Sequence, residues 1–189
     1  MTFEEISPKQ AHERLGEFQV IDVRAEREFR GPLGRVSGAK LVPLPEIEAR
    51  SGELRGGRPL LLVCRSGGRS GKACEKLAAL GVGPVVNLAG GMIAWSRAKL
   101  PVEQTEPASL RELLDDVVSW VAQVTAREPQ TVRGELRESL RQRGLSLDEP
   151  THVGVEQALG LVEGSLRGGG APQDLELSLA SFRRSLAVL

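Results

Sequence analysis

The chain has 189 residues, of which 40% are hydrophobic and 26% are charged, and its 25 basic and 25 acidic side chains leave no net charge. This length suits one domain of about 100 residues with a smaller second one, and the composition argues against a disordered chain. Without net positive charge and without any tyrosine, the chain lacks the general features of proteins that bind nucleic acid or an anionic membrane, and we expect neither partner.

The first residues and the two cysteines, Cys64 and Cys74, favour a cytoplasmic location. The N-terminal sequence lacks the basic and apolar regions of a secretion signal, and no apolar run is long enough to span a bilayer. In the cytoplasm a thiol stays reduced and more often has a chemical role than a place in a structural disulfide. We therefore expect a cytoplasmic protein with reduced cysteines.

The first segments of the chain predict a short helix and then a short strand. Ser7 and Pro8 are typical of the N-cap and the first residue of a helix, which should end at Gly16. Residues 18–23 are rich in β-branched side chains and predict a strand. A charged cluster follows this strand and leads to a turn.

Strands and helices then continue to alternate. Residues 40–43 predict an extended segment, and residues 45–54 predict a helix. Residues 59–63 form the most apolar run in the chain, as expected for a central strand buried on both faces. A helix over residues 70–80 and a strand over residues 84–88 come next. This alternation predicts an α/β fold, a parallel sheet with helices on both faces.

The pattern changes after Pro101, and only helices are predicted beyond it. One apolar stripe with helical spacing marks a long helix: Leu110, Leu113, Leu114, Val117, Val118, Val121 and Val124. Three further helices are predicted over residues 133–143, 151–167 and 174–188. We therefore expect two domains, an α/β domain over residues 1–104 and a small antiparallel bundle of about four helices over residues 105–189.

The segment after the central strand carries the residues suited to chemistry. Cys64 follows the strand directly, and a loop with two glycines leads from it into a helix. The N–H groups of such a loop and the helix dipole stabilise an anion at the loop's centre, so they should favour the thiolate of Cys64. We interpret Cys64 as the catalytic nucleophile. The predicted substrate-binding residues are Arg65, Ser66, Gly67, Gly68, Arg69 and Ser70.

The remaining cysteine and the histidines lack comparable surroundings. Cys74 lies inside the following helix, and we interpret it as a packing residue, since a resolving role would require it to reach Cys64. His12 and His152 are isolated in the sequence. They provide neither metal-ligand spacing nor a Cys-His pair, so we expect no metal site and no histidine base.

Three charged residues after the first strand, Asp22, Arg24 and Glu28, allow two interpretations. They could form a catalytic acid-base set. We favour an ion-pair and hydrogen-bond network that braces the end of the strand.

The loop sequence over residues 64–70 resembles the active-site loop of single-domain rhodaneses, the thiosulfate sulfurtransferase-like family. Three other groups of segments resemble that family in the same order: Ile21-Asp22-Val23-Arg24 with Glu28-Phe29, Gly34-Arg35-Val36-Ser37-Gly38-Ala39 with Pro43, and Leu88-Ala89-Gly90-Gly91 with Trp95 and Leu100-Pro101-Val102. The resemblance covers roughly residues 2–104. The sequence departs from the family pattern at two neighbouring positions. Arg35 replaces the usual histidine, and residues 31–33 add length before it, so we expect the local structure of this segment to differ from that of the family.

The resemblance implies a rhodanese-like fold and sulfurtransferase activity. Cys64 would take sulfane sulfur from thiosulfate or a protein persulfide, hold it as a persulfide, and pass it to cyanide or a thiol. Arg65 and Arg69 would attract the anionic donor. No metal or organic cofactor is implied.

Two other functions must be weighed against this one. Phosphatases and arsenate reductases of the cysteine-loop type need an arginine six positions after the cysteine, whereas this chain has Ser70 there and Arg69 one position early. The second alternative is a regulatory module that senses sulfur or oxidants, with the helical domain binding a protein partner or forming a homodimer. The sequence leaves this alternative open.

Overall fold

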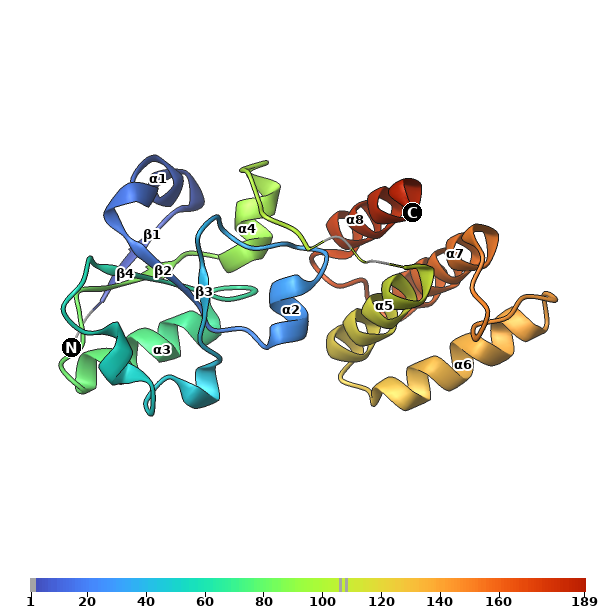
Figure 1. Cartoon of the computed structure of the whole chain (residues 1–189), viewed down its shortest axis with the longest axis horizontal. Coiled ribbons are helices and arrows are strands. Elements are labelled where there is room, and N and C mark those ends of the chain that lie inside the picture. The colour runs from blue at the N-terminus through green and yellow to red at the C-terminus, as the bar shows by residue number, and fades with distance from the viewer. Residues whose placement is uncertain (1–2, 106, 108) are drawn as a thin grey trace. The chain divides into compact units, whose positions relative to one another are not determined.

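The computed structural model describes residues 3–105, 107 and 109–189. Its internal contacts divide the chain into two compact units, Met1–Gln104 and Thr105–Leu189 (Figure 1). We propose that these units are the two separate domains whose boundary the change of sequence pattern predicts.

A five-stranded sheet forms the centre of the first unit, with the strand order β1-β5-β4-β2-β3. The strands are β1 (Glu4–Ile6), β2 (Gln19–Asp22), β3 (Lys40–Leu41), β4 (Leu60–Val63) and β5 (Val85–Leu88). Each described pair is parallel, which confirms the predicted fold class. All four residues of β4 are buried, as predicted for the central strand.

Helices flank this sheet. They are α1 (Pro8–Glu13), α2 (Glu26–Arg30), α3 (Gly68–Ala79) and α4 (Gly91–Arg97). Figure 1 shows α3 on one side of the sheet and α1 and α4 on the other. α3 packs against β4 and β5, and α1 packs against α4. The core under α3 includes Leu62, Ala73 and Leu77, each fully buried.

The predicted helix over residues 45–54 is wrong. The segment forms two 3-10 helices, Leu44–Glu46 and Ser51–Leu54, separated by turns. Ser51 and Gly52 are poor helix formers, and a continuous α-helix through them is disfavoured. The buried side chains of Ile47 and Leu54 still anchor the segment to the core.

Two short elements were not predicted. β1 has three residues, two of which are exposed glutamates, so it carries no apolar pattern of its own. It forms because its backbone pairs with β5 along the edge of the sheet. α2 has five residues and four charged side chains, and it lies within the segment that we predicted only as a charged cluster.

The second unit consists of four helices packed together, as predicted: α5 (Leu110–Thr125), α6 (Pro129–Arg141), α7 (His152–Gly168) and α8 (Leu175–Val188). The apolar stripe of α5 points into its core, where Val117 and Leu140 are fully buried. Trp120 of α5 meets Phe182 of α8 edge to face, with ring centroids 5.7 Å apart. These helices pack together because each buries an apolar face, and the spacing of apolar residues in the sequence predicted such faces.

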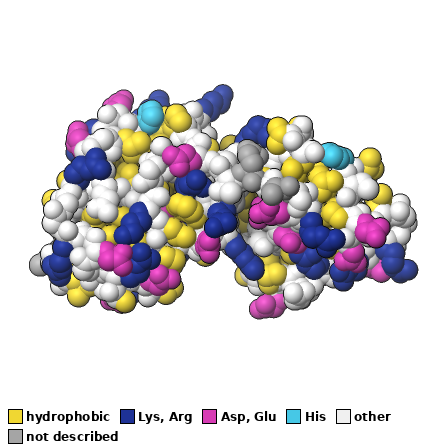
Figure 2. Space-filling view, viewed as in Figure 1, with side chains coloured by type: hydrophobic (Ala, Val, Ile, Leu, Met, Phe, Trp, Pro, Cys, Tyr) yellow, Lys and Arg dark blue, Asp and Glu magenta, His cyan; other side chains and the backbone are white. Residues whose placement is uncertain are grey.

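Basic and acidic side chains are interspersed on the visible face of the molecule (Figure 2). This mixture agrees with the absence of net charge. Within the described part of the chain, none of the helices has the length and apolar character that crossing a bilayer requires.

A buried ion pair braces the carboxyl end of β2. Arg24 and Asp22 have side chains only 1% and 0% exposed, and Nη2 of Arg24 lies 2.7 Å from Oδ2 of Asp22. The same Nη2 donates to the carbonyl oxygen of Gly34 at 2.7 Å. The predicted ion pair between Asp22 and Arg24 is therefore present in the structure.

Removing one member of this pair should destabilise the first unit strongly. Asp22→Ala leaves a buried guanidinium without its carboxylate, which costs about 3–5 kcal/mol. Denaturant unfolding measures this loss of stability, with the fluorescence of Trp95 as the probe. The chain has two tryptophans, one in each unit, so the experiment uses a Trp120→Phe background in which only the first unit is followed. Glu26→Ala is the control, because Glu26 forms an exposed pair with Arg30 and its loss should cost little. Equal effects of the two substitutions would contradict the bracing role.

Candidate active site around Cys64

Cys64 is the first residue after β4, at the carboxyl edge of the sheet, and only 1% of it is exposed. Its carbonyl oxygen accepts the N–H of Met92 at 2.9 Å, and the next carbonyl, that of Arg65, accepts the N–H of Ile93 at 3.0 Å. These N–H groups belong to the first turn of α4, where no partner within the helix is available. The start of α4 therefore fixes the backbone at Cys64.

Two groups contact the sulfur atom, one from the loop and one from the first turn of α3. The N–H of Gly67 donates to Sγ of Cys64 at 3.1 Å, and Oγ of Ser70 lies 3.3 Å from Sγ. Oγ of Ser70 also lies 3.0 Å from the carbonyl oxygen of Gly67. A hydroxyl has one proton, so Ser70 can donate to the carbonyl while the thiol is neutral and to the sulfur when it is a thiolate.

The loop needs glycine at position 67. Gly67 has φ +94°, in the region that disfavours side chains, and a Cβ there would lie 3.1 Å from the backbone nitrogen of Gly90. The turn it makes leads directly into α3, which runs for 12 residues from Gly68. The amino end of that helix adds positive potential beside the sulfur.

The six predicted binding residues do not share one environment. Gly67 and Ser70 are buried next to Cys64, whereas Ser66 and Gly68 are exposed. The side chains of Arg65 and Arg69 are of intermediate exposure. The structure thus brings two of the six to the sulfur atom itself, and the binding roles of all six remain predictions.

Arg69 is paired with Glu28 of α2. Its two terminal nitrogens each lie 2.5 Å from a carboxylate oxygen of Glu28. The predicted network of Asp22, Arg24 and Glu28 is therefore divided: Asp22 and Arg24 pair with each other, and Glu28 reaches the active-site loop.

Glu103 contacts the segment around Arg35, where the sequence departs from the rhodanese pattern. Nε of Arg35 lies 3.3 Å from Oε2 of Glu103, and the hydroxyl of Ser37 donates to Oε1 at 2.7 Å. The hydrogen bond from Ser37 contributes most to lowering the pKa of Glu103. The guanidinium of Arg35 also lies over the ring of Phe29, 5.0 Å from its centroid. Arg35 therefore forms local contacts of its own where the family usually has histidine.

Cys74 is fully buried in α3. Burial is the main cause that raises the pKa of its thiol to about 12, so Cys74 stays protonated at neutral pH. This supports the interpretation of Cys74 as a packing residue.

Gly91 is a site residue whose role sequence reasoning missed. Its φ is +55°, and a Cβ there would overlap the backbone of Cys64 and lie 2.7 Å from the carbonyl carbon of Arg65. Its only signal in the sequence was the Gly-Gly pair after a predicted strand.

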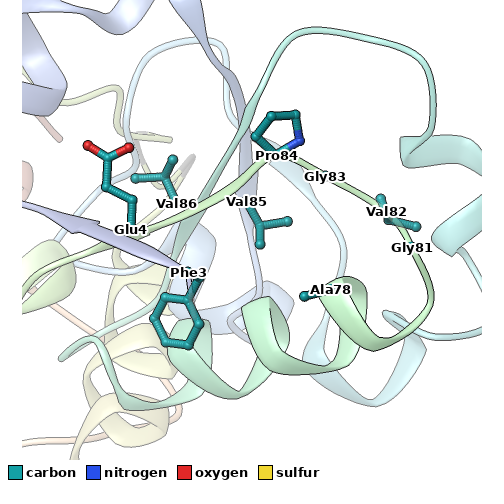
Figure 3. Close-up of a pocket in the computed structure, with 9 residues that line it drawn as sticks. All are labelled: Phe3, Glu4, Ala78, Gly81, Val82, Gly83, Pro84, Val85 and Val86. Atoms are coloured by element: carbon teal, nitrogen blue, oxygen red, sulfur yellow. The ribbon is translucent and has the colours of Figure 1, made fainter. Parts of the chain in front are cut away.

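A cavity of about 770 Å³ lies away from Cys64 (Figure 3). Figure 3 shows it between the start of β1, the start of β5 and the end of α3, and its lining residues are Phe3, Glu4, Ala78, Gly81, Val82, Gly83, Pro84, Val85 and Val86. None of the predicted site residues lines it. In the part of the chain that the structure describes, no group of three or more His, Cys, Asp or Glu residues could hold a metal ion.

Substituting Gly91 should disturb the site and lower stability. In Gly91→Ala the left-handed backbone alone costs about 1–3 kcal/mol, and the new methyl group must displace the backbone at Cys64 and Arg65. Unfolding followed through Trp95 measures the loss. The matched control is Gly52→Ala in the same unit, where the new Cβ meets nothing within 4 Å. A Gly91→Ala protein as stable as the control would show that the close approach is not needed.

Comparison with known proteins identifies the family of the first unit. A family model described as the rhodanese-like domain matches residues 7–98. The chain is 35% identical over 105 residues to a sulfurtransferase of Allochromatium vinosum, covering 54% of this chain and 96% of that protein. It is 34% identical over 107 residues to thiosulfate sulfurtransferase 18 of Arabidopsis thaliana, covering 48% and 77% of the two chains.

Solved structures agree with this assignment. A rhodanese-related protein from Thermoplasma volcanium matches with a TM-score of 0.51 and 25% identity, over 55% of this chain and all of that one. Other relatives include an uncharacterised protein of Bacillus subtilis, of which the chain spans 60%, and a transcriptional regulator of Mycobacterium tuberculosis, of which it spans 40%. The helical region after residue 98 is not matched by any family. Through its first unit, the chain belongs to the rhodanese-like family, as its motifs predicted.

Proposed function

We propose that the chain is a sulfurtransferase that carries sulfane sulfur as a persulfide on Cys64. The observation that carries the proposal is the pair of donors at Sγ, the N–H of Gly67 at 3.1 Å and the hydroxyl of Ser70 at 3.3 Å. Both can donate to an anionic sulfur, and both lie beside the amino end of α3. Membership in a family that includes sulfurtransferases supports the same chemistry.

The proposed reaction has two displacements. The thiolate of Cys64 attacks the outer sulfur of thiosulfate, the S–S bond of the donor breaks, and sulfite leaves with the electron pair. The negative charge then resides on the persulfide. Cyanide attacks the outer sulfur of that persulfide and leaves as thiocyanate, and the Cys64 thiolate is restored. A protein persulfide could replace thiosulfate as donor, and a thiol could replace cyanide as acceptor.

The loop would stabilise each anion in turn. Gly67 and Ser70 would donate to the anionic sulfur of Cys64, and residues 65, 66, 68 and 69 would bind the donor. No metal or organic cofactor enters this scheme. Because Cys64 is almost fully buried, small donors and acceptors fit the proposal better than bulky ones.

The regulatory alternative uses the same first step. A sensor would form the persulfide on Cys64 but transfer it slowly, and its helical domain would bind a protein partner or a second copy of the chain. One relative is a transcriptional regulator, which supports considering this alternative. Turnover separates the two proposals, because only a sulfurtransferase discharges its persulfide repeatedly.

The reaction with thiosulfate and cyanide tests the proposed enzyme. Thiocyanate formation should be lost in Cys64→Ser, because serine does not form the persulfide. It should fall by about 10-fold in Ser70→Ala, because one of the hydrogen-bond donors to the sulfur is removed. Cys74→Ala is the control and should retain the wild-type rate, since Cys74 is buried and protonated. Thiocyanate formation by Cys64→Ser would contradict the proposal, and absence of turnover in the wild type with persulfide still formed would favour the sensor.

A further inference from the structure

The pair formed by Glu28 and Arg69 joins α2 to the first turn of α3, which follows the Cys64 loop. Both carboxylate oxygens of Glu28 contact the guanidinium, each at 2.5 Å, in the fork geometry that makes such pairs strong. The side chain of Glu28 is 8% exposed and that of Arg69 is 37% exposed. Oε2 of Glu28 also accepts the N–H of Ala25 at 3.2 Å, at the start of α2. The carboxylate is therefore held by its own helix and directed at Arg69.

The charge of Arg69 interacts electrostatically with that of Cys64. It directly precedes Ser70, whose hydroxyl contacts Sγ. The hydrogen bond from Glu28 is the main cause that raises the pKa of Arg69, and the charge of Cys64 contributes in the same direction. Electrostatic interaction is mutual, so a cation that is stabilised by the Cys64 thiolate also stabilises that thiolate.

The carboxylate opposes this effect. With Glu28 in contact with the guanidinium, the sulfur experiences the difference between a positive and a negative charge rather than a full cation. The carboxylate of Glu28 does not cancel the dipoles of the loop and of α3 in the same manner, because the N–H of Gly67 donates directly to Sγ.

We propose that Glu28 is a positioning residue that offsets the charge of Arg69 at Cys64, so that the loop N–H, Ser70 and the α3 terminus supply most of the anion stabilisation. The benefit is reactivity. A thiolate that is stabilised too strongly becomes a poorer nucleophile, and the best attacking thiol ionises near the ambient pH. This inference rests on the proposed role of Cys64 as the reactive thiolate, but not on the identity of the sulfur donor.

Ultraviolet absorbance of the thiolate, recorded against pH, tests the proposal on the full chain. The protein suits this measurement because it has no tyrosine. Cys74 stays silent, because its pKa is about 12. A Cys64→Ser protein supplies the baseline, and the quantity compared is the pH at which half of Cys64 is ionised.

Opposite shifts are expected in the two single variants. Glu28→Gln removes a negative charge and should lower the midpoint by about 0.5 pH unit, a roughly 3-fold gain in the thiolate-to-thiol ratio. Arg69→Gln removes a positive charge and should raise the midpoint by a similar amount. The double variant should return close to the wild-type value, because the two charges are lost together.

Two further variants separate charge from structure. Glu26→Gln makes the same change at an exposed position on α2, where the partner is Arg30, and should not move the midpoint. Arg69→Lys keeps the cation and should also stay near the wild-type midpoint. If the pair had only a structural role, the midpoint would instead move in the same direction in all three variants, Glu28→Gln, Arg69→Gln and Arg69→Lys.

Shifts of Glu28→Gln and Arg69→Gln in the same direction, or no shift in Glu28→Gln, would overturn the proposal. The titration needs no sulfur donor. Opposite shifts in a protein that transfers no sulfur would therefore support this inference while contradicting the proposed function.

Discussion

The hydrogen bonds between the end of β4 and the first turn of α4 hold the whole candidate site in place. They run from Met92 and Ile93 to the carbonyl oxygens of Cys64 and Arg65, at 2.9 and 3.0 Å. They give the first N–H groups of a helix the partners that they otherwise lack. They also form only because Gly91 lets the two backbones approach so closely. With its carbonyl fixed on this side, Cys64 presents its sulfur to the loop that enters α3.

In the proposed mechanism, backbone groups and one hydroxyl provide most of the stabilisation of the anion. Gly67 and Ser70 contact the sulfur, while the nearby cation of Arg69 is engaged by Glu28. Fixed dipoles in a buried site need little reorganisation when charge develops, which would suit the proposed cycle from thiolate to persulfide and back. Cys74 is kept out of this chemistry by burial.

The sequence predicted the parts of this arrangement that are local in the chain. The apolar run over residues 59–63 predicted the central strand, and the cysteine, glycines and helix start after it predicted the loop, because these features depend on neighbouring residues. The pairing of Arg69 with Glu28 joins residues 41 positions apart. It depends on where α2 lies in the folded unit, and α2 itself has too few apolar residues to be predicted. β1 was missed for the same reason, since its pairing with β5 rather than its own composition makes it a strand.

Intact-mass analysis after treatment with thiosulfate tests the central claim, that Cys64 carries sulfur covalently. The account predicts that the wild-type protein gains one sulfur atom, about 32 Da, that Cys64→Ser gains none, and that cyanide removes the added mass. A wild-type protein that gains no mass from thiosulfate or from a polysulfide donor, or an added sulfur that persists in Cys64→Ser, would contradict it.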